Sequence, residues 1–188
     1  MSWQDIRIET ERLILRPPQG QDFDAYAIAS ADPEVRRFLG GMVERPLAWR
    51  HFLQKAGAWP IQGFSMFSVI EKSSQTWVGL LGPWYPEGWP GREVGWSLAR
   101  HAWGKGYATE GATAAMDFAF DVLGWDEVIH SIDSDNVASQ KVAQRLGSRR
   151  RGSSRLPLPP PHDETLIDIW GQSRDEWHAR RNTKQHDV

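Results

Sequence analysis

A strand-to-helix turn built on two glycines constrains the fold of this chain more than any other feature. Gly104-Lys105-Gly106 follows an expected strand at residues 92–98 and opens the most regular helical pattern in the chain, at residues 107–123. Glycine lets the backbone approach a ligand closely, and the first N–H groups of a helix have no partner inside the helix. Because the helix dipole adds positive potential there, such a turn is a ready site for an anion. The segment therefore predicts a pyrophosphate cradle, with a tight turn that merely needs glycine as the simpler alternative.

The residues around this turn separate three kinds of phosphate-binding loop. A Walker A loop needs Ser or Thr directly after Gly-Lys, but Gly106 follows Lys105 here, so that loop is excluded. A dinucleotide-binding fingerprint needs a third glycine or alanine where Thr109 stands, and its ribose-binding acid would be Glu127, at the wrong end of the next strand. Residues 103–108 fit the acyl-CoA loop pattern Gln/Arg-x-x-Gly-x-Gly/Ala at every position except the first, which is Trp103. We therefore expect an acyl-CoA loop and keep a dinucleotide-binding protein as the less favoured alternative.

Composition excludes several classes of protein. A chain of 188 residues is long enough for one domain that needs no cross-links. Its net charge of −2 gives no field that would attract nucleic acid or an anionic membrane. There is no cysteine, and the six histidines show no metal-ligand spacing, so we expect neither a disulfide nor a metal site. No apolar run is long enough for a transmembrane helix, and the first residues lack the apolar core of a signal peptide, so we expect a cytoplasmic protein.

The order of the expected elements is that of one mixed α/β domain over residues 1–188, because no repeat and no linker divides the chain. Strands are expected at residues 6–16, 64–70, 76–82, 92–98, 127–133 and 166–170, and helices at residues 22–31, 46–57, 107–123 and 136–146. Asn136 and Gly147 suit the two ends of the last of these helices. Residues 153–165 are predicted to be a proline-rich loop, and residues 174–188 a polar C-terminal tail that begins with a helix.

A second segment, Asn136-x-x-Ser139 with Leu146-Gly147 after it, completes a recognisable series. With it the chain resembles the GNAT N-acetyltransferase superfamily, specifically its Rim-type (RimJ/RimL-like) branch, over nearly its whole length. No single piece is decisive, but together they occur in the order and at the intervals of that branch. The other pieces are Thr10-Glu11-Arg12-Leu13-Ile14-Leu15-Arg16, Glu93-Val94-Gly95-Trp96, Trp103-Gly104-Lys105-Gly106-Tyr107-Ala108-Thr109-Glu110, Asp168-Ile169-Trp170 and Asp175-Glu176-Trp177.

This resemblance implies both a fold and a coenzyme site. The fold is a GNAT-like α/β (α+β) domain whose central mixed, mostly antiparallel sheet is flanked by helices, with its fourth and fifth strands splayed apart. Acetyl-CoA is expected in the cleft that the splay opens. Backbone groups of Trp96, Ser97 and Leu98 would hold the pantetheine, and Asn136 would contact the coenzyme arm. The implied pyrophosphate-binding loop consists of Trp103, Gly104, Lys105, Gly106, Tyr107, Ala108 and Thr109.

The resemblance also implies direct transfer of an acetyl group, in a ternary complex, to a primary amine of a protein N-terminus or a small molecule. Glu93 stands where many relatives keep a carboxylate base, although a solvent-facing strand residue fits its position equally well. Many relatives place a tyrosine that acts as the general acid where this chain has Ala143. Ser139 matches a serine of the Rim-type branch and is the candidate donor to the departing thiolate, with a serine on the helix surface or capping its first turn as the alternative. The missing tyrosine leaves open a non-catalytic acyl-CoA-binding sensor or interaction module. A homodimer is also left open, and the sequence does not identify the acceptor.

Eleven tryptophans in 188 residues are several times ordinary usage. Three of them, Trp84, Trp89 and Trp96, lie in or beside a segment rich in proline and glycine at residues 83–91. Each is expected to be a packing residue, because tryptophan buries a large area. An aromatic wall around a ligand pocket is the alternative, and the sequence does not assign the segment a role.

Overall fold

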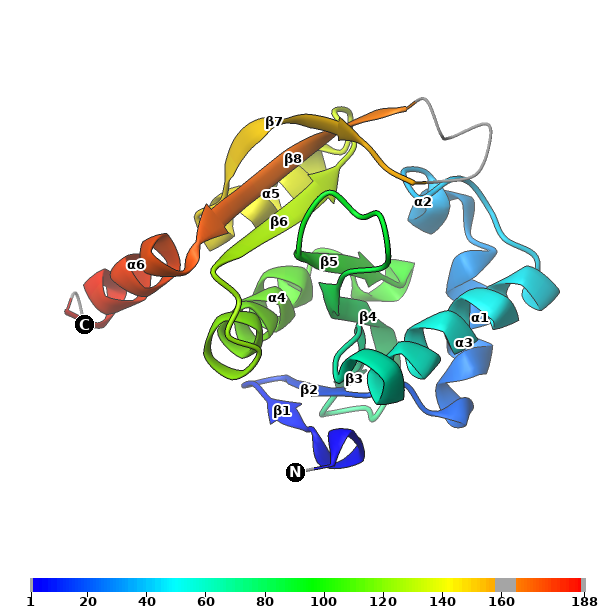
Figure 1. Cartoon of the computed structure of the whole chain (residues 1–188). Coiled ribbons are helices and arrows are strands. Elements are labelled where there is room, and N and C mark those ends of the chain that lie inside the picture. Colours follow the sequence, from blue (N-terminus) through cyan, green and yellow to red (C-terminus); the bar gives the residue numbers. More distant parts are fainter. Residues whose placement is uncertain (1, 158–164, 187–188) are drawn as a thin grey trace. The chain divides into compact units, whose positions relative to one another are not determined.

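The computed structural model describes residues 2–157 and 165–186, which divide into two compact units (Figure 1). The first unit consists of Met1–Trp84 and Gly95–Ala115, and the second of Tyr85–Val94 and Met116–Val188. Strand β5 (Glu93–Leu98) and helix α4 (Tyr107–Asp117) each begin in one unit and end in the other. These two elements therefore carry residues of both units.

The first unit is built on strands that pair in sequence order. Strands β1 to β4 are joined by antiparallel pairing, with Leu13 opposite Glu71 and Phe67 opposite Leu81, and β5 follows β4 in the strand order. The strands are β1 (Ile8–Glu9), β2 (Leu13–Arg16), β3 (Phe67–Glu71) and β4 (Trp77–Trp84). The helices are α1 (Phe23–Ser30), α2 (Pro33–Arg36) and α3 (Arg45–Gln62), followed by α4.

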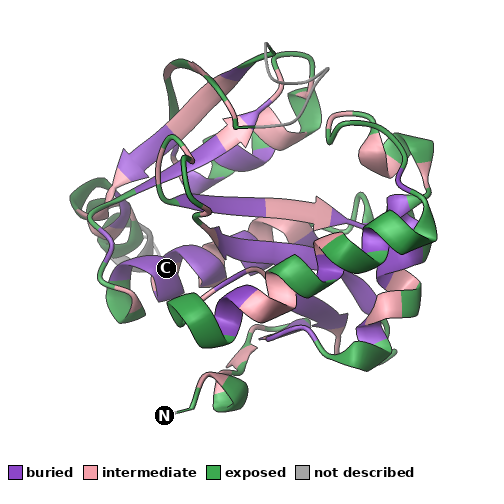
Figure 2. Cartoon of the chain, turned by 45° about the vertical axis from the view of Figure 1, so that its right-hand side comes forward, coloured by how far each residue is buried: buried purple, intermediate pink, exposed green. Residues whose placement is uncertain are grey.

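Aromatic packing joins helices α1 and α3 to one face of these strands. The ring of Tyr26 in α1 lies 5.4 Å from that of Phe52 in α3 and 6.2 Å from that of Trp77 in β4, measured between centroids. Ile14 of β2 and Ile70 of β3 belong to the same buried cluster. In Figure 2 the buried residues run along the strands, while exposed residues line the outer sides of the helices. This face supplies the apolar burial that stabilises the first unit.

Helix α4 contacts the alternate residues of the same strands, which point to the opposite face. A Cβ atom on Gly111 would lie 2.5 Å from Leu81 Cδ2 and 3.5 Å from Leu13 Cδ1. Ala112 and Ala115 of the same helix are fully buried. Small residues thus let α4 approach the strands closely, and this approach fixes the direction of its N-terminal end.

The second unit has its own strands around β6 (Glu127–Ile132). Strand β8 (Leu166–Ser173) pairs antiparallel with β6 on one side and with β7 (Arg149–Arg155) on the other, as Figure 1 shows. The beginning of β5 pairs with β6 in parallel, with Glu93 opposite Ile129. Helices α5 (Val137–Leu146) and α6 (Arg174–His186) complete the unit. The predicted mixed, mostly antiparallel strands flanked by helices are confirmed, and the splay beyond Glu93 stays a prediction.

Both end signals of helix α5 are confirmed. The side-chain oxygen of Asn136 accepts a hydrogen bond from the Ser139 N–H at 3.1 Å and so caps the first turn. Gly147 ends the helix in the left-handed region at φ +93°, with its N–H bonded to the Gln144 carbonyl. These are local interactions, which the sequence alone predicts well.

Four element boundaries were predicted wrongly. The single strand expected over residues 6–16 is a hairpin of β1 and β2, with Ile8 opposite Leu15, because the chain turns back after Glu9. Helix α4 ends at Asp117 rather than near residue 123, and a π-helix follows it at Phe118–Val122.

The predicted loop at residues 153–165 begins later, because residues 153–155 belong to β7, where Ser153 lies opposite Asp168 of β8. Residues 158–164 of that segment lie outside the described residues. Helix α3 continues past Gly57 to Gln62, although Pro60 lies inside it. Its last turn is held by Trp59, which is fully buried and donates its indole N–H to the Met66 carbonyl at 3.2 Å.

The C-terminal tail packs more tightly than its polar composition indicates. Trp177 of α6 is buried, its ring centroid lies 6.3 Å from that of Phe120, and its indole N–H donates to Asp117 at 2.8 Å. The predicted tail is therefore a docked helix of the second unit. Among the helices that the structure describes, α6 included, none is both long and apolar enough to cross a membrane.

We expect Gly79→Ala to destabilise the first unit. A Cβ atom at this position of β4 would lie 2.4 Å from the Ser97 carbonyl oxygen and 2.9 Å from Leu98 Cα, both backbone atoms of β5. Overpacking of this kind lowers the free energy of unfolding by about 1–3 kcal/mol. For a chain of this length, thermal unfolding followed by circular dichroism should show a melting temperature lower by roughly 2–4 °C for each kcal/mol.

Gly57→Ala is the matched control. Gly57 lies inside α3, and a Cβ atom there would meet no heavy atom within 4 Å. Alanine favours a helix interior over glycine by about 0.5–1 kcal/mol, so this variant should melt at the same or a higher temperature. Equal losses in both variants would contradict a role for the close approach of β4 to β5.

Candidate active site

The glycine turn presents free backbone donors at the beginning of α4. Gly104 and Gly106 have φ values of +73° and +83°, in the left-handed region that favours glycine. The Glu110 N–H bonds to the Gly106 carbonyl at 3.1 Å, so the N–H groups of the three residues between them belong to the unpaired first turn. Those residues are Tyr107, Ala108 and Thr109. The structure thus brings the predicted pyrophosphate-binding N–H groups together in one turn.

The space beside the glycines tests whether a pyrophosphate fits. A Cβ atom on Gly104 would meet no heavy atom within 4 Å, and one on Gly106 would meet only Arg12 Nη2, at 3.4 Å. A side chain at either glycine would therefore fill space that the fold itself leaves open. These features fit the backbone approach of an anionic group.

An ion pair with the N-terminal hairpin supports this turn. The guanidinium of Arg12 donates to the Glu110 carboxylate at 2.7 Å and to the Lys105 carbonyl at 2.9 Å. The Thr10 hydroxyl and the Arg12 N–H donate to the same carboxylate, at 2.6 and 2.8 Å. Burial alone would raise the pKa of Glu110, but these hydrogen bonds outweigh burial and lower it. Glu110 is therefore an ionised anchor that ties α4 to residues 10–12.

The side chains of two predicted coenzyme residues are directed towards Glu71 at the end of β3. The Tyr107 hydroxyl donates to the Glu71 carboxylate, and Lys105 Nζ lies 3.4 Å from the same carboxylate. The hydrogen bond from the Ser74 hydroxyl and then that from Tyr107 lower the pKa of Glu71 to about 2. Tyr107 and Lys105 thus contribute their backbone to the turn, while their side chains stabilise it.

The remaining residues of the first unit that were predicted to bind the coenzyme lie on β5 and just after it. Trp103 donates its indole N–H to the Leu98 carbonyl at 2.8 Å, so this predicted pantetheine partner has one acceptor site already used. Leu98 is buried, whereas Trp96 and Ser97 are half-buried. The bonds that these residues would make with pantetheine stay a prediction.

Glu93 is buried at the beginning of β5 in the second unit. Only 7% of the residue is exposed, so the solvent-facing alternative for this glutamate is wrong. Its Oε2 accepts from the Trp89 indole N–H at 2.5 Å and from the Ser131 hydroxyl at 3.0 Å. Burial raises the pKa of Glu93 to about 7, although the hydrogen bonds from Trp89 and Ser131 oppose the rise. A carboxyl group with this pKa accepts and releases a proton readily at neutral pH.

The second predicted cluster lies at the beginning of α5. Asn136 uses its side-chain oxygen as the helix cap, and Ser139 is half-buried one turn into the helix. Ala143, where many relatives place a tyrosine, is fully buried, and its carbonyl accepts from the Ser148 N–H. This position therefore provides neither an acidic group nor an exposed surface.

A series of buried, hydrogen-bonded side chains lies beside Glu93, and the sequence analysis did not predict it. His130 lies 2.6 Å from the Val94 carbonyl through Nδ1 and 2.8 Å from Ser148 Oγ through Nε2, and Gln172 donates to Ser148 Oγ at 2.8 Å. A carbonyl only accepts, so Nδ1 carries the proton and Nε2 accepts from the serine hydroxyl. Burial lowers the pKa of His130 to about 4, which keeps the ring neutral. This series of hydrogen bonds holds the backbone of β5 at Val94, the residue next to Glu93.

Sequence reasoning also missed Trp89 and Ser131 as partners of Glu93. Trp89 lies in an irregular loop, where no periodic pattern indicates which way a side chain points. Ser131 becomes a neighbour of Glu93 only through the pairing of β5 with β6, which the sequence does not specify. The position of Glu93 on a strand was the one signal that a partner from β6 should exist.

Comparison with known proteins places these features in a family. The model of the acetyltransferase (GNAT) domain matches residues 12–149 and so reaches into both units. The chain is 28% identical over 149 residues to p20 of Bacillus licheniformis, which is named an uncharacterized N-acetyltransferase, and the match covers 78% of this chain and 84% of p20.

Solved structures show the same fold. An acetyltransferase from Agrobacterium tumefaciens is 28% identical and superposes with a TM-score of 0.78, covering 90% of this chain and 95% of that one. The ribosomal-protein-S5-alanine acetyltransferase of Vibrio fischeri is 18% identical, with a TM-score of 0.68 and coverage of 92% and 99%, and this likeness concerns the fold alone. With the family model matched over most of its length, the chain belongs to the GNAT acetyltransferase family.

Proposed function

We propose that this protein is an acetyl-CoA-dependent N-acetyltransferase that transfers the acetyl group directly to a primary amine in a ternary complex. The observation that carries the proposal is Glu93, a buried carboxyl group whose pKa of about 7 suits a general base at neutral pH. Membership of the GNAT family supports acetyl transfer with acetyl-CoA as co-substrate. When bound, acetyl-CoA supplies the activated acetyl thioester.

In this proposal the coenzyme is held mainly through backbone groups. The N–H groups at Gly104, Gly106 and the first turn of α4 would bind the pyrophosphate, and residues 96–98 would bind the pantetheine. Lys105 and Arg12 carry positive charge at the turn, and both are already paired with carboxylates, at Glu71 and Glu110. Specificity for the anion would therefore rest on hydrogen bonds from the N–H groups more than on side-chain charge.

Proton transfer in this proposal depends on side chains. Glu93 would take a proton from the ammonium form of the acceptor and leave a neutral amine with a free lone pair. Asn136 would contact the coenzyme arm, and the Ser139 hydroxyl would donate a hydrogen bond to the departing thiolate. Because Ala143 offers no acid, much of the acceleration would come from holding both reactants in place.

Two classes of acceptor are proposed, the N-terminal amine of a protein and a small amine such as a polyamine or an antibiotic. The first follows the Rim-type motifs in the sequence and is in line with the activity named for the Vibrio fischeri structure. A non-catalytic acyl-CoA-binding sensor is the second candidate function, and the buried Ala143 is the observation that favours it. A thiol-release assay separates the two functions, since a sensor binds CoA but releases no thiol with any amine.

Gly106→Val should abolish tight binding of CoA. A valine there would strain a backbone at φ +83° and occupy the space beside the N–H groups. The loss of two charge-assisted hydrogen bonds, each worth about 1.5–3 kcal/mol, lowers affinity by roughly 100-fold or more. Isothermal titration calorimetry with CoA measures this change.

Gly124→Val controls for strain in that experiment. Gly124 has a positive φ of +67°, as the glycines of the turn do, and open space around a Cβ atom, as Gly104 has, but it lies in the second unit before β6. Its variant should lose stability and keep its affinity for CoA. Unchanged affinity in the Gly106 variant would contradict the proposed cradle.

Glu93→Gln should reduce turnover most at neutral pH. General-base catalysis contributes typically about 10²–10⁴-fold, so we expect a loss of that order at pH 7. At high pH the acceptor amine loses its proton unaided, and the loss should shrink. The measurement is the pH profile of kcat/KM for thiol release with alanine- and serine-initiated peptides, polyamines and aminoglycosides. The control is Glu87→Gln, since Glu87 is exposed in the loop that precedes β5, and this variant should leave the profile unchanged. An equal loss for Glu93→Gln at both ends of the pH range would make Glu93 structural.

The same Glu93 variant should change how stability depends on pH. The folded state holds a proton on Glu93 up to a pH of about 7, whereas the unfolded chain releases it near the ordinary pKa of 4.5, so this group loses stabilising effect as pH rises from 4.5 to 7. Glu93→Gln removes that loss. Relative to the parent, the variant should therefore gain up to about 3 kcal/mol in free energy of unfolding between pH 4.5 and pH 8. Urea titrations at both pH values measure this difference between the variant and the parent. The contribution of His130 cancels because both proteins contain it.

A further inference from the structure

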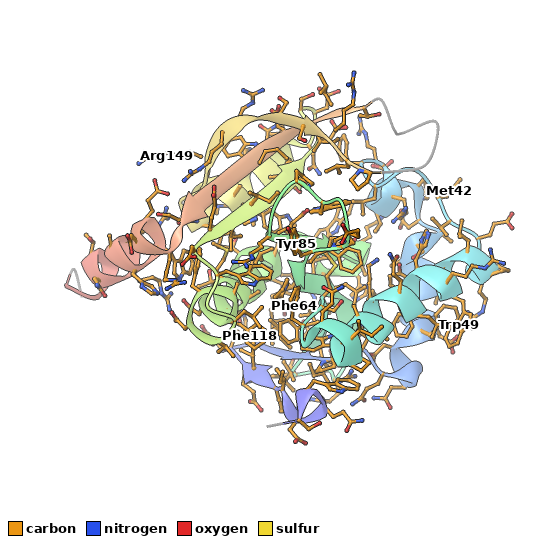
Figure 3. The ribbon with its side chains drawn as sticks, viewed as in Figure 1. Met42, Trp49, Phe64, Tyr85, Phe118 and Arg149 are labelled. Carbon is orange, nitrogen blue, oxygen red and sulfur yellow. The ribbon has the colours of Figure 1, made fainter. Side chains whose placement is uncertain are left out.

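The loop before β5 (residues 85–92) ends in a hydrogen bond to the candidate base. Tyr85, labelled in Figure 3, begins the loop and is exposed, whereas Trp89, four residues before Glu93, is half-buried. The Trp89 N–H bonds to the Pro86 carbonyl at 3.1 Å and closes a turn. Its indole N–H then donates to Glu93 Oε2 at 2.5 Å. The loop is therefore fixed to the carboxyl group through one tryptophan.

The two oxygens of Glu93 are in different environments. Oε2 accepts from both Trp89 and the Ser131 hydroxyl, at 2.5 and 3.0 Å, which uses its two lone pairs. Within residues 2–157 and 165–186, the partner of Oε1 is the Ser131 N–H, through a long contact of 3.4 Å. The oxygen with unused acceptor capacity is therefore Oε1.

In the described part of the chain, the charged groups on neighbouring elements are engaged elsewhere. At the end of the loop, the Arg92 guanidinium lies 5.8 Å from the ring centroid of Trp125. On β6, His130 is neutral and bonded to the Val94 carbonyl, and on β8 Asp168 is paired with Arg150 at 2.8 Å. Glu87 of the loop is exposed. Among the groups that the structure describes, burial and the hydrogen bonds from Trp89 and Ser131 thus determine the state of the Glu93 carboxyl group.

We propose that Trp89 is a positioning residue that, together with Ser131, binds Glu93 Oε2 and so directs proton transfer to Oε1. This inference rests on the proposed function of Glu93 as the base. In the step, an N–H bond of the acceptor ammonium breaks and an O–H bond forms at Oε1. The nitrogen keeps the electron pair, and the carboxylate becomes a neutral carboxyl group whose Oε2 still accepts from Trp89 and Ser131.

The proposal assigns the loop a definite role in the reaction. Without the indole donor, the ionised carboxylate loses a strong hydrogen bond in a site that already disfavours charge. The base would then need a higher pH to ionise. Its carboxyl group would also be free to rotate, so that neither oxygen would be fixed towards the acceptor.

Trp89→Phe tests the proposal, because phenylalanine keeps the aromatic ring and removes the N–H. The Glu93 carboxyl group is titrated by ¹³C NMR in protein labelled at glutamate Cδ, with Glu93→Gln to assign its signal. Losing one charge-assisted hydrogen bond should raise the pKa of Glu93 by about one pH unit. The acid limb of the kcat/KM profile should move to higher pH by the same amount, while the plateau at high pH changes less.

Trp177→Phe is the matched control. Trp177 also donates its indole N–H to a carboxylate, that of Asp117, and it lies in the same unit. Its variant should lower the melting temperature and leave the titration of Glu93 unchanged. If Trp89→Phe does not fold, Ser131→Ala removes the second donor to Oε2 and should move the titration in the same direction.

The outcomes separate this inference from the proposed function. An unchanged pKa of Glu93 in Trp89→Phe or Ser131→Ala overturns the positioning role. A raised pKa without any movement of the kcat/KM limb shows that Trp89 holds a carboxyl group that is not the base, and this overturns both the proposed role of Glu93 and the inference. A raised pKa with a matching movement of the limb supports both.

Discussion

The ion pair between Glu110 and Arg12 is the interaction on which the glycine turn depends. A carboxylate in the first turn of α4 suits the helix dipole, but by itself it would repel the pyrophosphate that the turn is proposed to bind. Arg12 removes this conflict by pairing with Glu110, and its second bond, to the Lys105 carbonyl, holds the turn in place. One arginine thus neutralises the acid and fixes the backbone. The N-terminal hairpin is therefore part of the proposed coenzyme site, although it would contribute no group to the coenzyme itself.

The two units set the pKa values of their carboxyl groups by opposite physical means. In the first unit, acidic groups are kept ionised by partners, as the pKa values of Glu71 and Glu110 show, and backbone donors remain available. In the second unit, burial outweighs the hydrogen bonds to Glu93 and brings its pKa near neutrality. Strand β5 joins these environments within six residues, because it begins with Glu93 and continues through Trp96 to Leu98. A group for proton transfer and the proposed pantetheine residues thus follow one another along a single strand.

The end signals of helix α5 were reliable, whereas the end expected for a helix at Gly57 and the segments that depend on distant pairing were not. Asn136 and Gly147 bound helix α5 as predicted, because each acts on its own turn. Strand β7 was not predicted, because its residues are mostly exposed and no alternation of apolar side chains marks it. Its pairing with β8 comes from a segment further along the chain.

The candidate site shows the same difference between local and long-range signals. The spacing of Gly104 and Gly106 predicted a turn whose N–H groups lie together, because this follows from neighbouring residues. The burial of Glu93 was not predictable, since it arises from Trp89 in an irregular loop and Ser131 on another strand. The role of the tryptophan-rich segment was invisible for the same reason, and a pocket shared by Trp84, Trp89 and Trp96 stays a prediction.

The hydrogen bonds from Gln172 through Ser148 and His130 to Val94 all run in one direction, from donor to acceptor. Because the series ends on a backbone carbonyl, every hydrogen in it points the same way, and the imidazole is held as a single tautomer. Its Nδ1 proton is enclosed by protein, so exchange with deuterium requires this part of the unit to open. The exchange rate of the His130 ring proton therefore reports how often the strand that carries the proposed base opens.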